Sequence, residues 1–327
     1  MLCPICESHD TKFVFEGYDH TYGYPKPAQM YQCRHCKHLF AGDTLSPEEL
    51  TDMYTNYYKR GDLDVENYQP YRRKNWFLSW LDGESGGAYY HVPRNVRVLD
   101  IGCGYCETLG YHQNRGCEAY GCDADENTRK IAERHGFRVK IGLFNSDDYE
   151  RNYFDYVTMD HVLEHLVDPV ATIRDVAKVL KSPDSSDSGG GRLVMVSPSP
   201  CSLSRYCFGN AWSGWHLPFH RQFFTKKSLH LLAEKTGFVV EKMVSATQSA
   251  ILCANWALFV TPHAPGKRRS NDAFLRGKNG DVIEEDQKRL DVLFYLFLLK
   301  SRVFALPMRL ADALGVGDWD LMILRKK

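Results

Sequence analysis

The 327-residue sequence predicts an α/β protein built on a doubly wound, largely parallel sheet of seven strands. Residues 96–105 read as an apolar strand that suits burial on both faces and breaks at once into a turn bearing Gly102 and Gly104. Short apolar runs then alternate with helical patterns over residues 94–245, as in folds with parallel strands. Two Cys-x-x-Cys motifs near the N-terminus indicate a small metal-binding module ahead of this sheet.

Composition restricts the classes of function. The 41 basic and 41 acidic side chains give a formal net charge of zero, whereas a protein whose main partner is nucleic acid usually presents a basic surface. Hydrophobic residues make up 43% of the chain, which is typical of a folded globular protein. Because the first residues show no basic stretch followed by an apolar one, we expect a cytoplasmic protein whose 11 cysteines are reduced or bound to metal.

Residues 1–45 are predicted to form a zinc-ribbon-like module. Each Cys-x-x-Cys turn places two sulfurs on one side, and four thiolates complete a tetrahedral Zn²⁺ site of the structural kind. The segments 11–15 and 30–32 read as short strands that bring the two turns together. The module has too little core to fold alone, so the metal is expected to supply much of its stability. The predicted ligands are Cys3, Cys6, Cys33 and Cys36, and the alternatives are a redox pair or four unconnected thiols.

Residues 46–93 are predicted to form a helical linker between the zinc module and the sheet. Ser46 has the features of a helix N-cap, since a proline and two acidic residues follow it. Several tyrosines come next, and we interpret most of them as an aromatic packing face.

The other elements follow from the periodicity of apolar residues. Strands are expected at residues 96–101, 118–123, 137–141, 154–159, 191–197, 238–244 and 319–324. A helix over 226–236 should end at Gly237, which suits the left-handed position after a helix. Residues 246–327 comprise a helical insertion and the final strand, with an apolar helix at 290–310. Its apolar run is too short to cross a bilayer, so we expect packing on the domain or in a homodimer, with a lid or membrane contact as the less favoured alternative.

The glycine turn predicts a nucleotide-type site. Gly102 and Gly104 lack a Cβ, so a ligand can lie close to the backbone, and the following helix directs free N–H groups toward it. Asp100 ends the strand and is placed to hold the turn or to touch the ligand. Asp123 ends the next strand, roughly 20 residues after the glycines, where a ribose diol is bound in such folds. The turn departs from the dinucleotide fingerprint, since Glu107 stands where a third glycine is expected.

Three motifs, residues 98–104, 121–123 and 154–165, together resemble the class I S-adenosylmethionine-dependent methyltransferases, and most closely their small-molecule branch. The last motif has the sequence Phe-Asp-Tyr-Val-Thr-Met-Asp-His-Val-Leu-Glu-His, and the resemblance extends over about residues 94–244. It implies a Rossmann-like fold, S-adenosylmethionine as cofactor, and a linker that covers it. The residues it assigns to cofactor binding are Asp100, Gly102, Cys103, Gly104, Asp123, Ala124, Leu143, Phe144, Asp160, His161 and Tyr71.

An aromatic and histidine-rich segment at residues 212–225 should lie over the carboxyl ends of the strands, where ligands of α/β proteins bind. Methyl transfer from a sulfonium needs alignment and removal of one proton, and an imidazole of near-neutral pKa is suited to take it. His161, His216 and His220 are the candidate bases, whereas His165 is expected to pack at a helix start.

The resemblance leaves the acceptor open. We favour a hydroxyl of a small molecule, namely a sugar, a glycan precursor or a secondary metabolite. Sugar C-methyltransferases share the plan of a zinc-binding N-terminus, but they usually carry a further C-terminal domain that this sequence lacks. A zinc-ribbon rRNA base methyltransferase is the second alternative, and a non-catalytic protein that keeps the cofactor fold is the third.

Overall fold

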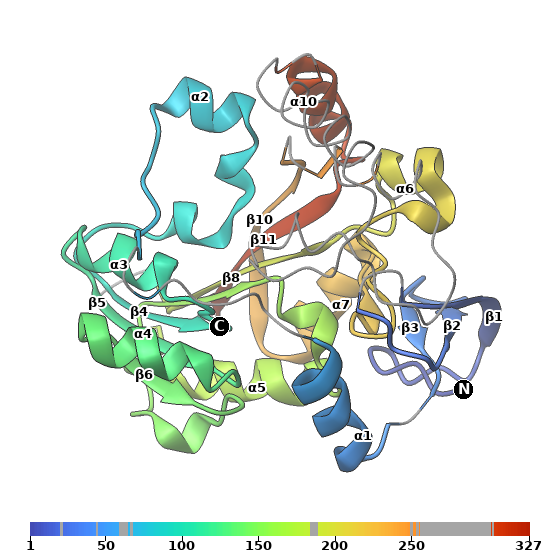
Figure 1. Ribbon diagram of the computed structural model, residues 1–327, viewed down its shortest axis with the longest axis horizontal. Coiled ribbons are helices and arrows are strands. Elements are labelled where there is room, and N and C mark those ends of the chain that lie inside the picture. Colours follow the sequence, from blue (N-terminus) through green and yellow to red (C-terminus); the bar gives the residue numbers. More distant parts are fainter. Residues whose placement is uncertain are drawn as a thin grey trace, which may run out of the picture.

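The computed structural model describes residues 1–19, 22–43, 45–58, 65, 68–183, 189–248, 251–252, 255, 302 and 304–327. At its centre is a seven-stranded sheet in the order β10-β11-β8-β7-β4-β5-β6 (Figure 1). The strands are β4 (Arg97–Ile101), β5 (Glu118–Asp123), β6 (Arg138–Ile141), β7 (Tyr156–Asp160), β8 (Arg192–Pro198), β10 (Phe238–Ala246) and β11 (Trp319–Lys326). Six strands run in the same direction, while β11 is antiparallel to both β8 and β10. The seven strands expected from the sequence are confirmed, and the sheet is mixed.

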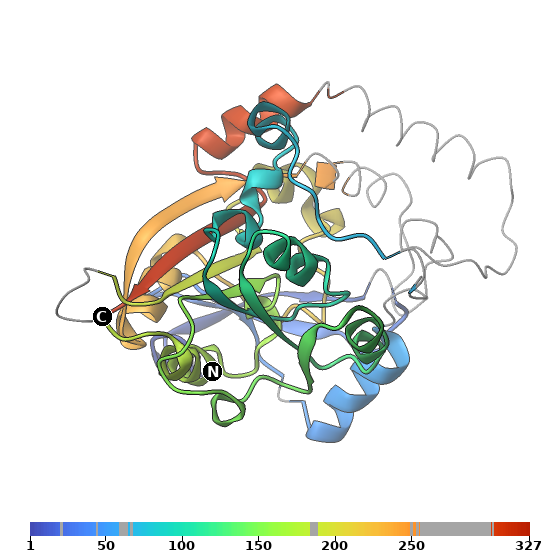
Figure 2. The same cartoon turned by 90° about the vertical axis from the view of Figure 1, so that its left-hand side faces the viewer.

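Helices cover both faces of this sheet (Figures 1 and 2). The helices of the described chain are α1 (Pro47–Asp52), continued by a π-helical turn (Met53–Tyr57), α2 (Trp76–Leu81), α3 (Glu107–Gln113), α4 (Asn127–His135), α5 (Pro169–Val179), α6 (Leu203–Phe208), α7 (Lys226–Lys235) and α10 (Ala305–Ala313). Successive strand residues alternate between two cores, as a pleated sheet requires. Leu193 and Met195 of β8 pack on the side of α5 and α7, whereas Val194 and Val196 pack against Ala88 on the other side.

The helix ends agree with their sequence signals, with one exception. The Ser46 hydroxyl accepts from the backbone N–H of Glu49 and forms a capping box. Gly237 adopts a φ of +83° directly after α7. Helix α3 begins only at Glu107 and not directly after the glycine turn, because Cys106 takes a left-handed conformation with a φ of +62°.

A second sheet of four strands, in the order β1-β2-β3-β9, forms the N-terminal module. Its strands are β1 (Thr11–Gly17), β2 (Ala28–Cys33), β3 (Leu39–Ala41) and β9 (Gln222–Phe223). The fourth strand comes from the histidine-rich segment, and Leu39 lies opposite Phe223 in antiparallel register. The core is shared as well, since Cys3, Ile5 and Phe224 belong to the same buried cluster as residues of α5 and α7.

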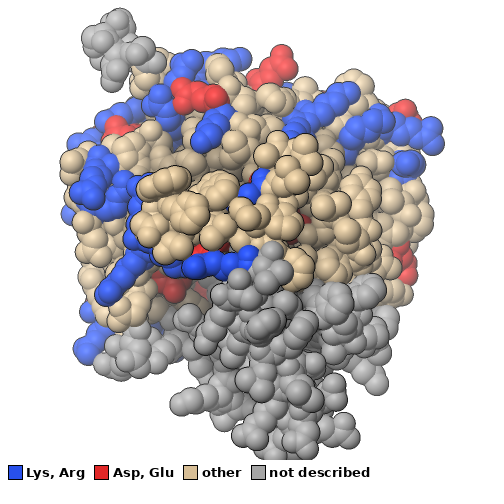
Figure 3. Space-filling view, turned by 90° about the horizontal axis from the view of Figure 1, so that it is seen from above, with Lys and Arg blue, Asp and Glu red and all other residues tan. Residues whose placement is uncertain are grey.

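The face seen from above in Figure 1 carries exposed apolar side chains between basic ones (Figure 3). Trp76, Phe77 and Trp80 of α2 are 74%, 49% and 40% exposed, and Leu306 and Leu310 of α10 are 66% and 62% exposed. No helix within the described ranges is long and apolar enough to span a membrane. Of the apolar helix expected at 290–310, only the end lies in the described residues, where α10 continues to Ala313. The remainder of that prediction lies outside them.

Candidate active site

Three carboxylates stand at the carboxyl ends of the adjacent parallel strands β7, β4 and β5. Asp100 is 4% exposed and accepts hydrogen bonds from the hydroxyls of Thr158, at 2.6 Å, and Thr108. Burial raises its pKa to about 6, and the negative charges of Asp160 and Asp123 contribute to the rise. This edge of the sheet is therefore suited to a ligand that carries positive charge.

The turn after β4 has the backbone that its glycines predict. Gly102 and Gly104 adopt φ values of +78° and +52°, which disfavour other residues. The Asp123 carboxylate accepts from the backbone N–H of Gly104 at 2.8 Å and from that of Asp125 at 2.9 Å. Asp123 thus fixes the turn in addition to the role expected for it toward a ribose.

The other residues assigned to the cofactor fall into two groups. Cys103 is buried, and its sulfur packs against Gly121 beneath the turn, so only its backbone can face a ligand above the glycines. Leu143 is 83% exposed, whereas Phe144 turns inward and stacks on Tyr149 at 5.9 Å. Leu143 is therefore the better placed of the two apolar candidates, and Ala124 is also exposed.

Tyr71 lies beside the turn at the start of α3. Its backbone N–H donates to the carbonyl oxygen of Glu107 at 3.1 Å, and its ring packs on Tyr89 at 5.1 Å. Burial and the nearby carboxylates of Glu107 and Asp160 raise the pKa of its hydroxyl, so this group is a neutral donor at physiological pH.

Asp160 and His161 follow β7 directly. The Asp160 carboxylate accepts from the backbone N–H of Ala88 at 2.8 Å, which ties the segment before β4 to the end of β7. His161 adopts a φ of +54°, and its ring packs edge-on against Trp319 at 4.6 Å. A non-glycine residue in this strained conformation is often found at a functional site.

The imidazoles of His161, His165 and His220 surround the carboxylate of Glu164, which is fully buried. His161 contacts one of its oxygens through Nδ1 at 3.1 Å, and Nε2 of His220 lies 3.8 Å from the same oxygen. The ring of His220 is 4.7 Å from that of His165 and 4.8 Å from that of His216. Burial lowers the pKa of His216 and His220, which keeps both rings neutral, while Glu164 raises the pKa of His161 against the effect of burial.

The structure thus brings together all three predicted catalytic histidines. Sequence reasoning missed the importance of Glu164 and interpreted His165 only as a packing residue. The signal for both was present, because His161, Glu164 and His165 occur within five residues, and His216 and His220 are four apart. Tyr22, Tyr58 and Phe219 line the cluster, with ring centres 5.3, 5.6 and 5.4 Å from His216.

The cluster is held in place by the N-terminal sheet. His220 is followed by Arg221, whose backbone N–H donates to the Glu164 carbonyl oxygen at 2.8 Å and whose guanidinium pairs with Asp43 at 3.0 Å. Gln222 then pairs with β3 and accepts a hydrogen bond from the ring of buried His38 at 2.8 Å.

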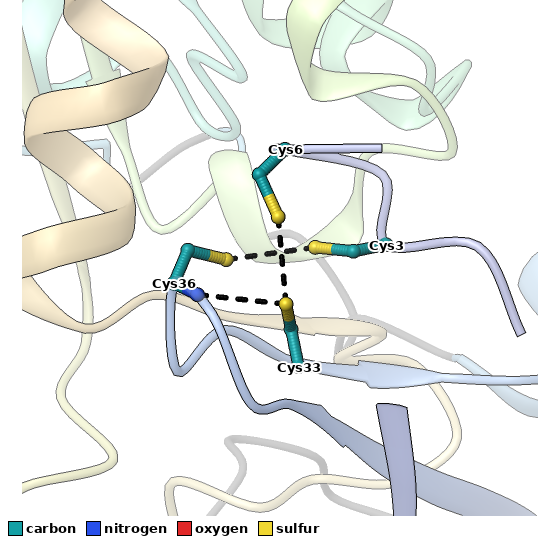
Figure 4. Close-up of side chains that lie close together, drawn as sticks. All are labelled: Cys3, Cys6, Cys33 and Cys36. Atoms are coloured by element: carbon teal, nitrogen blue, oxygen red, sulfur yellow. Dashed lines mark hydrogen bonds between the residues drawn. The ribbon is translucent and has the colours of Figure 1, made fainter. Parts of the chain in front are cut away.

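The cysteine cluster has the shape of a tetrathiolate metal site (Figure 4). The sulfurs of Cys3 and Cys36 are 3.6 Å apart, and those of Cys6 and Cys33 are 3.4 Å apart. A tetrahedral zinc ion with bonds of about 2.3 Å holds its sulfurs about 3.8 Å apart, close to these distances. A hydrogen bond from Cys36 lowers the pKa of Cys3 to about 4, so this cluster favours a thiolate.

Comparison with known proteins identifies the family to which this chain is similar. The model of a methyltransferase domain matches residues 68–243. The ubiquinone biosynthesis O-methyltransferase of Aeromonas salmonicida is 24% identical over 179 residues, which cover 51% of this chain and 70% of that protein. The enzyme of the same name from Azoarcus sp. is 31% identical over 111 residues, which cover 32% of this chain and 45% of that protein.

Among solved structures, phosphoethanolamine N-methyltransferase 2 of Haemonchus contortus, in complex with S-adenosyl-L-methionine, is 16% identical with a TM-score of 0.47. The match covers 98% of this chain and 70% of that one. Because the family model matches more than half of the sequence, the chain belongs to the methyltransferase-domain family and is a class I S-adenosylmethionine-dependent methyltransferase.

Proposed function

We propose that this enzyme transfers the methyl group of S-adenosylmethionine to a hydroxyl of a small molecule. The observation that carries the proposal is the meeting of His161, His216 and His220 at the carboxyl end of β7, beside the predicted donor site. Relatives named as ubiquinone biosynthesis O-methyltransferases support oxygen as the acceptor atom. We retain a sugar, a glycan precursor or a secondary metabolite as the acceptor class.

In this proposal the donor lies over the turn of Gly102 and Gly104. Asp123 binds the ribose, Leu143 packs on the adenine, and the methionine end lies near Asp160 and Tyr71. The positive charge of the donor suits the carboxylates that end β4, β5 and β7.

The chemistry needs little from the protein beyond alignment and one proton transfer. The acceptor oxygen attacks the methyl carbon as the bond from carbon to sulfur breaks, and S-adenosylhomocysteine leaves. The hydroxyl proton passes to an imidazole, and Nε2 of both His161 and His216 is buried without a hydrogen bond in the described part of the chain. Of the two, His161 is the stronger base, because Glu164 raises its pKa whereas burial lowers the pKa of His216.

We further propose that the cysteine cluster binds structural Zn²⁺. With four thiolates as ligands no coordination position is left for a substrate, so this metal has no direct part in the reaction. Its support reaches the active site through β3 and β9, which pair beside His220.

Calorimetric titration of the zinc-replete protein with S-adenosylmethionine and S-adenosylhomocysteine tests the donor site first. We expect both to bind, and Asp123→Ala should lose at least tenfold in affinity through its charge-assisted hydrogen bonds. Mass spectrometry of acceptor mixtures then identifies the methylated compound. Failure of both ligands to bind would remove the assignment of the glycine turn.

Two alternative acceptors are distinguishable. An rRNA base methyltransferase would bind RNA with an affinity that falls steeply with salt, and the zero net charge of the chain argues against it. A sugar C-methyltransferase would add a methyl group that is stable to ether cleavage, whereas an O-methyl product is not.

A further inference from the structure

Metal-ligand side chains gather at a second place, well separated in sequence from the cysteine cluster. Glu164, His165 and His220 each offer one ligand atom, and these atoms all lie within 4.8 Å of one another. Ligands of a tetrahedral ion with bonds of about 2.1 Å are about 3.4 Å apart, so closure by up to about 1.4 Å would complete the site. Two imidazoles and one carboxylate are a common ligand set for divalent transition metals.

The orientation of His220 matches that of a metal ligand. Its Nδ1 lies 2.9 Å from the carbonyl oxygen of Gly214, and because a carbonyl can only accept, the ring proton sits on Nδ1. Nε2 therefore keeps its lone pair, and this is the nitrogen that lies 3.8 Å from Glu164. Metal-binding histidines are usually fixed in this way by a backbone carbonyl behind the ring.

Unpaired polar atoms point to a missing partner at the same place. In the part of the chain that the structure describes, Oε2 of Glu164 and Nε2 of both His161 and His216 are buried without a hydrogen bond. Each such atom is costly, and three in one cluster exceed what a satisfied core tolerates. A bound cation would satisfy the carboxylate, whose side chain is fully buried.

We propose that Glu164, His165 and His220 bind a divalent transition-metal ion through one carboxylate oxygen, a ring nitrogen of His165 and Nε2 of His220. His161 and His216 stand beside this site, and Nε2 of each makes no hydrogen bond within the described residues. Three protein ligands leave a position open, which distinguishes this site from the closed cysteine cluster.

The role of the ion in the reaction rests on the proposed function. An acceptor hydroxyl in the open position has its pKa lowered by the cation, so it loses its proton to an imidazole more readily. The oxygen then forms its bond to the methyl carbon as the donor's bond to sulfur breaks. The cation also fixes the oxygen on the side of β7 where the donor is expected.

The test counts metal bound to the full-length protein. Purified protein that holds one zinc equivalent in the cysteine cluster is dialysed against Zn²⁺ or Mn²⁺, and bound metal is measured by mass spectrometry. We expect one further equivalent of at least one of these cations in the wild type. In His220→Asn, the side-chain amide can still donate to the Gly214 carbonyl oxygen in place of Nδ1, but the ligand atom Nε2 is gone. This variant should lose the second metal equivalent. Glu164→Gln should lose it as well.

His112→Asn is the matched control, since His112 is a fully buried histidine of α3 outside the cluster, and this variant should retain the further equivalent. Retention of the zinc in the cysteine cluster shows that each variant has folded. Should both cluster variants fail to fold, Co²⁺ is added to the zinc-loaded wild type and its absorption spectrum is recorded. Cobalt at the proposed site would show visible bands without charge transfer from sulfur, because this site has no thiolate ligand.

Saturation of the wild type at one equivalent with both cations would overturn the proposal. Equal metal content in the wild type and in both cluster variants would overturn it too. Donor titration is independent of these results. A chain that binds S-adenosylmethionine without a second metal refutes only this site, and a chain that binds the second metal without the donor refutes only the proposed function.

Discussion

Replacement of Asp100 by Asn should stabilise the ligand-free protein at neutral pH. Asp100 is buried at the end of β4, and burial raises its pKa from 3.8 to about 6. At roughly 1.4 kcal/mol per pH unit, ionisation of this carboxyl costs the folded state about 3 kcal/mol above pH 6. Asn has the same shape, and the hydroxyls of Thr108 and Thr158 can rotate to accept from its amide. We expect a net gain of about 1–3 kcal/mol at pH 8.

The sign of this effect follows from how the free energy of unfolding depends on pH. Because the pKa is higher in the folded state, the folded protein holds the proton between pH 4 and 6 while the unfolded chain has lost it, so this group lowers stability as pH rises through that range. The gain from Asp100→Asn should therefore be largest at pH 8 and shrink toward pH 5. Urea unfolding of metal-replete wild type and variant, followed by tryptophan fluorescence, measures it. Asp147→Asn, which alters an exposed carboxylate, is the control and should show no such trend.

A variant that is less stable than the wild type at pH 8, or a difference that does not change with pH, would refute this account. Donor binding gives a second readout. The positive charge of S-adenosylmethionine should offset the buried carboxylate, so the donor should raise the melting temperature of the wild type more than that of the variant. Asp100 would then destabilise the ligand-free protein and increase its affinity for the donor.

Three further predictions concern the cysteine cluster, the glycine turn and an exposed side chain of α2. Chelation of the metal in the cysteine cluster should shift the fluorescence of buried Trp212 to longer wavelength and abolish methyl transfer, because β9 loses its partner strand, and unchanged activity would contradict this coupling. Gly102→Ala should lower the free energy of unfolding by at least 1–2 kcal/mol and weaken donor binding, since its Cβ would lie 2.4 Å from Val162. Gly136→Ala is the control for the positive φ alone, because no atom lies within 4 Å of the added Cβ. Trp76→Ser should change the free energy of unfolding by less than about 0.5 kcal/mol in urea titrations, as its side chain is 74% exposed.

The central sheet could be predicted because its signals are local. Each strand is a short apolar run that ends in a turn residue, and Gly237 and Ser46 mark helix ends that the structure reproduces. Gly102 and Asp123 were identifiable because spacing along the chain fixes their places at neighbouring strand ends. Their hydrogen-bond partners could not be identified from the sequence, since the contact of Asp123 with the Gly104 amide depends on how two strands lie side by side.

The histidine cluster could be predicted only in part. His161 could be identified because it follows a predicted strand, and His216 and His220 because their segment is expected over the carboxyl ends of the strands. Glu164 could not, because a carboxylate at a helix start is common and nothing local shows that it is fully buried. Its environment is created by Arg221 and the rings of a segment more than 50 residues away.

The pairing of β3 with β9 joins the N-terminal module to the segment that carries His220, so the module is not an independent appendage. A strand of two residues has too few hydrogen bonds to hold its own conformation, so β9 is ordered by β3, and β3 is ordered by the turn that carries Cys33 and Cys36. Phe224 joins the same buried cluster as Cys3 and Cys36, so the cysteine cluster and the core restrain this segment together. His220 lies two residues before β9, and its distance to Glu164 therefore depends on a cluster built almost 200 residues earlier in the sequence. On this reasoning the cysteines act on the reaction by fixing where the imidazoles stand.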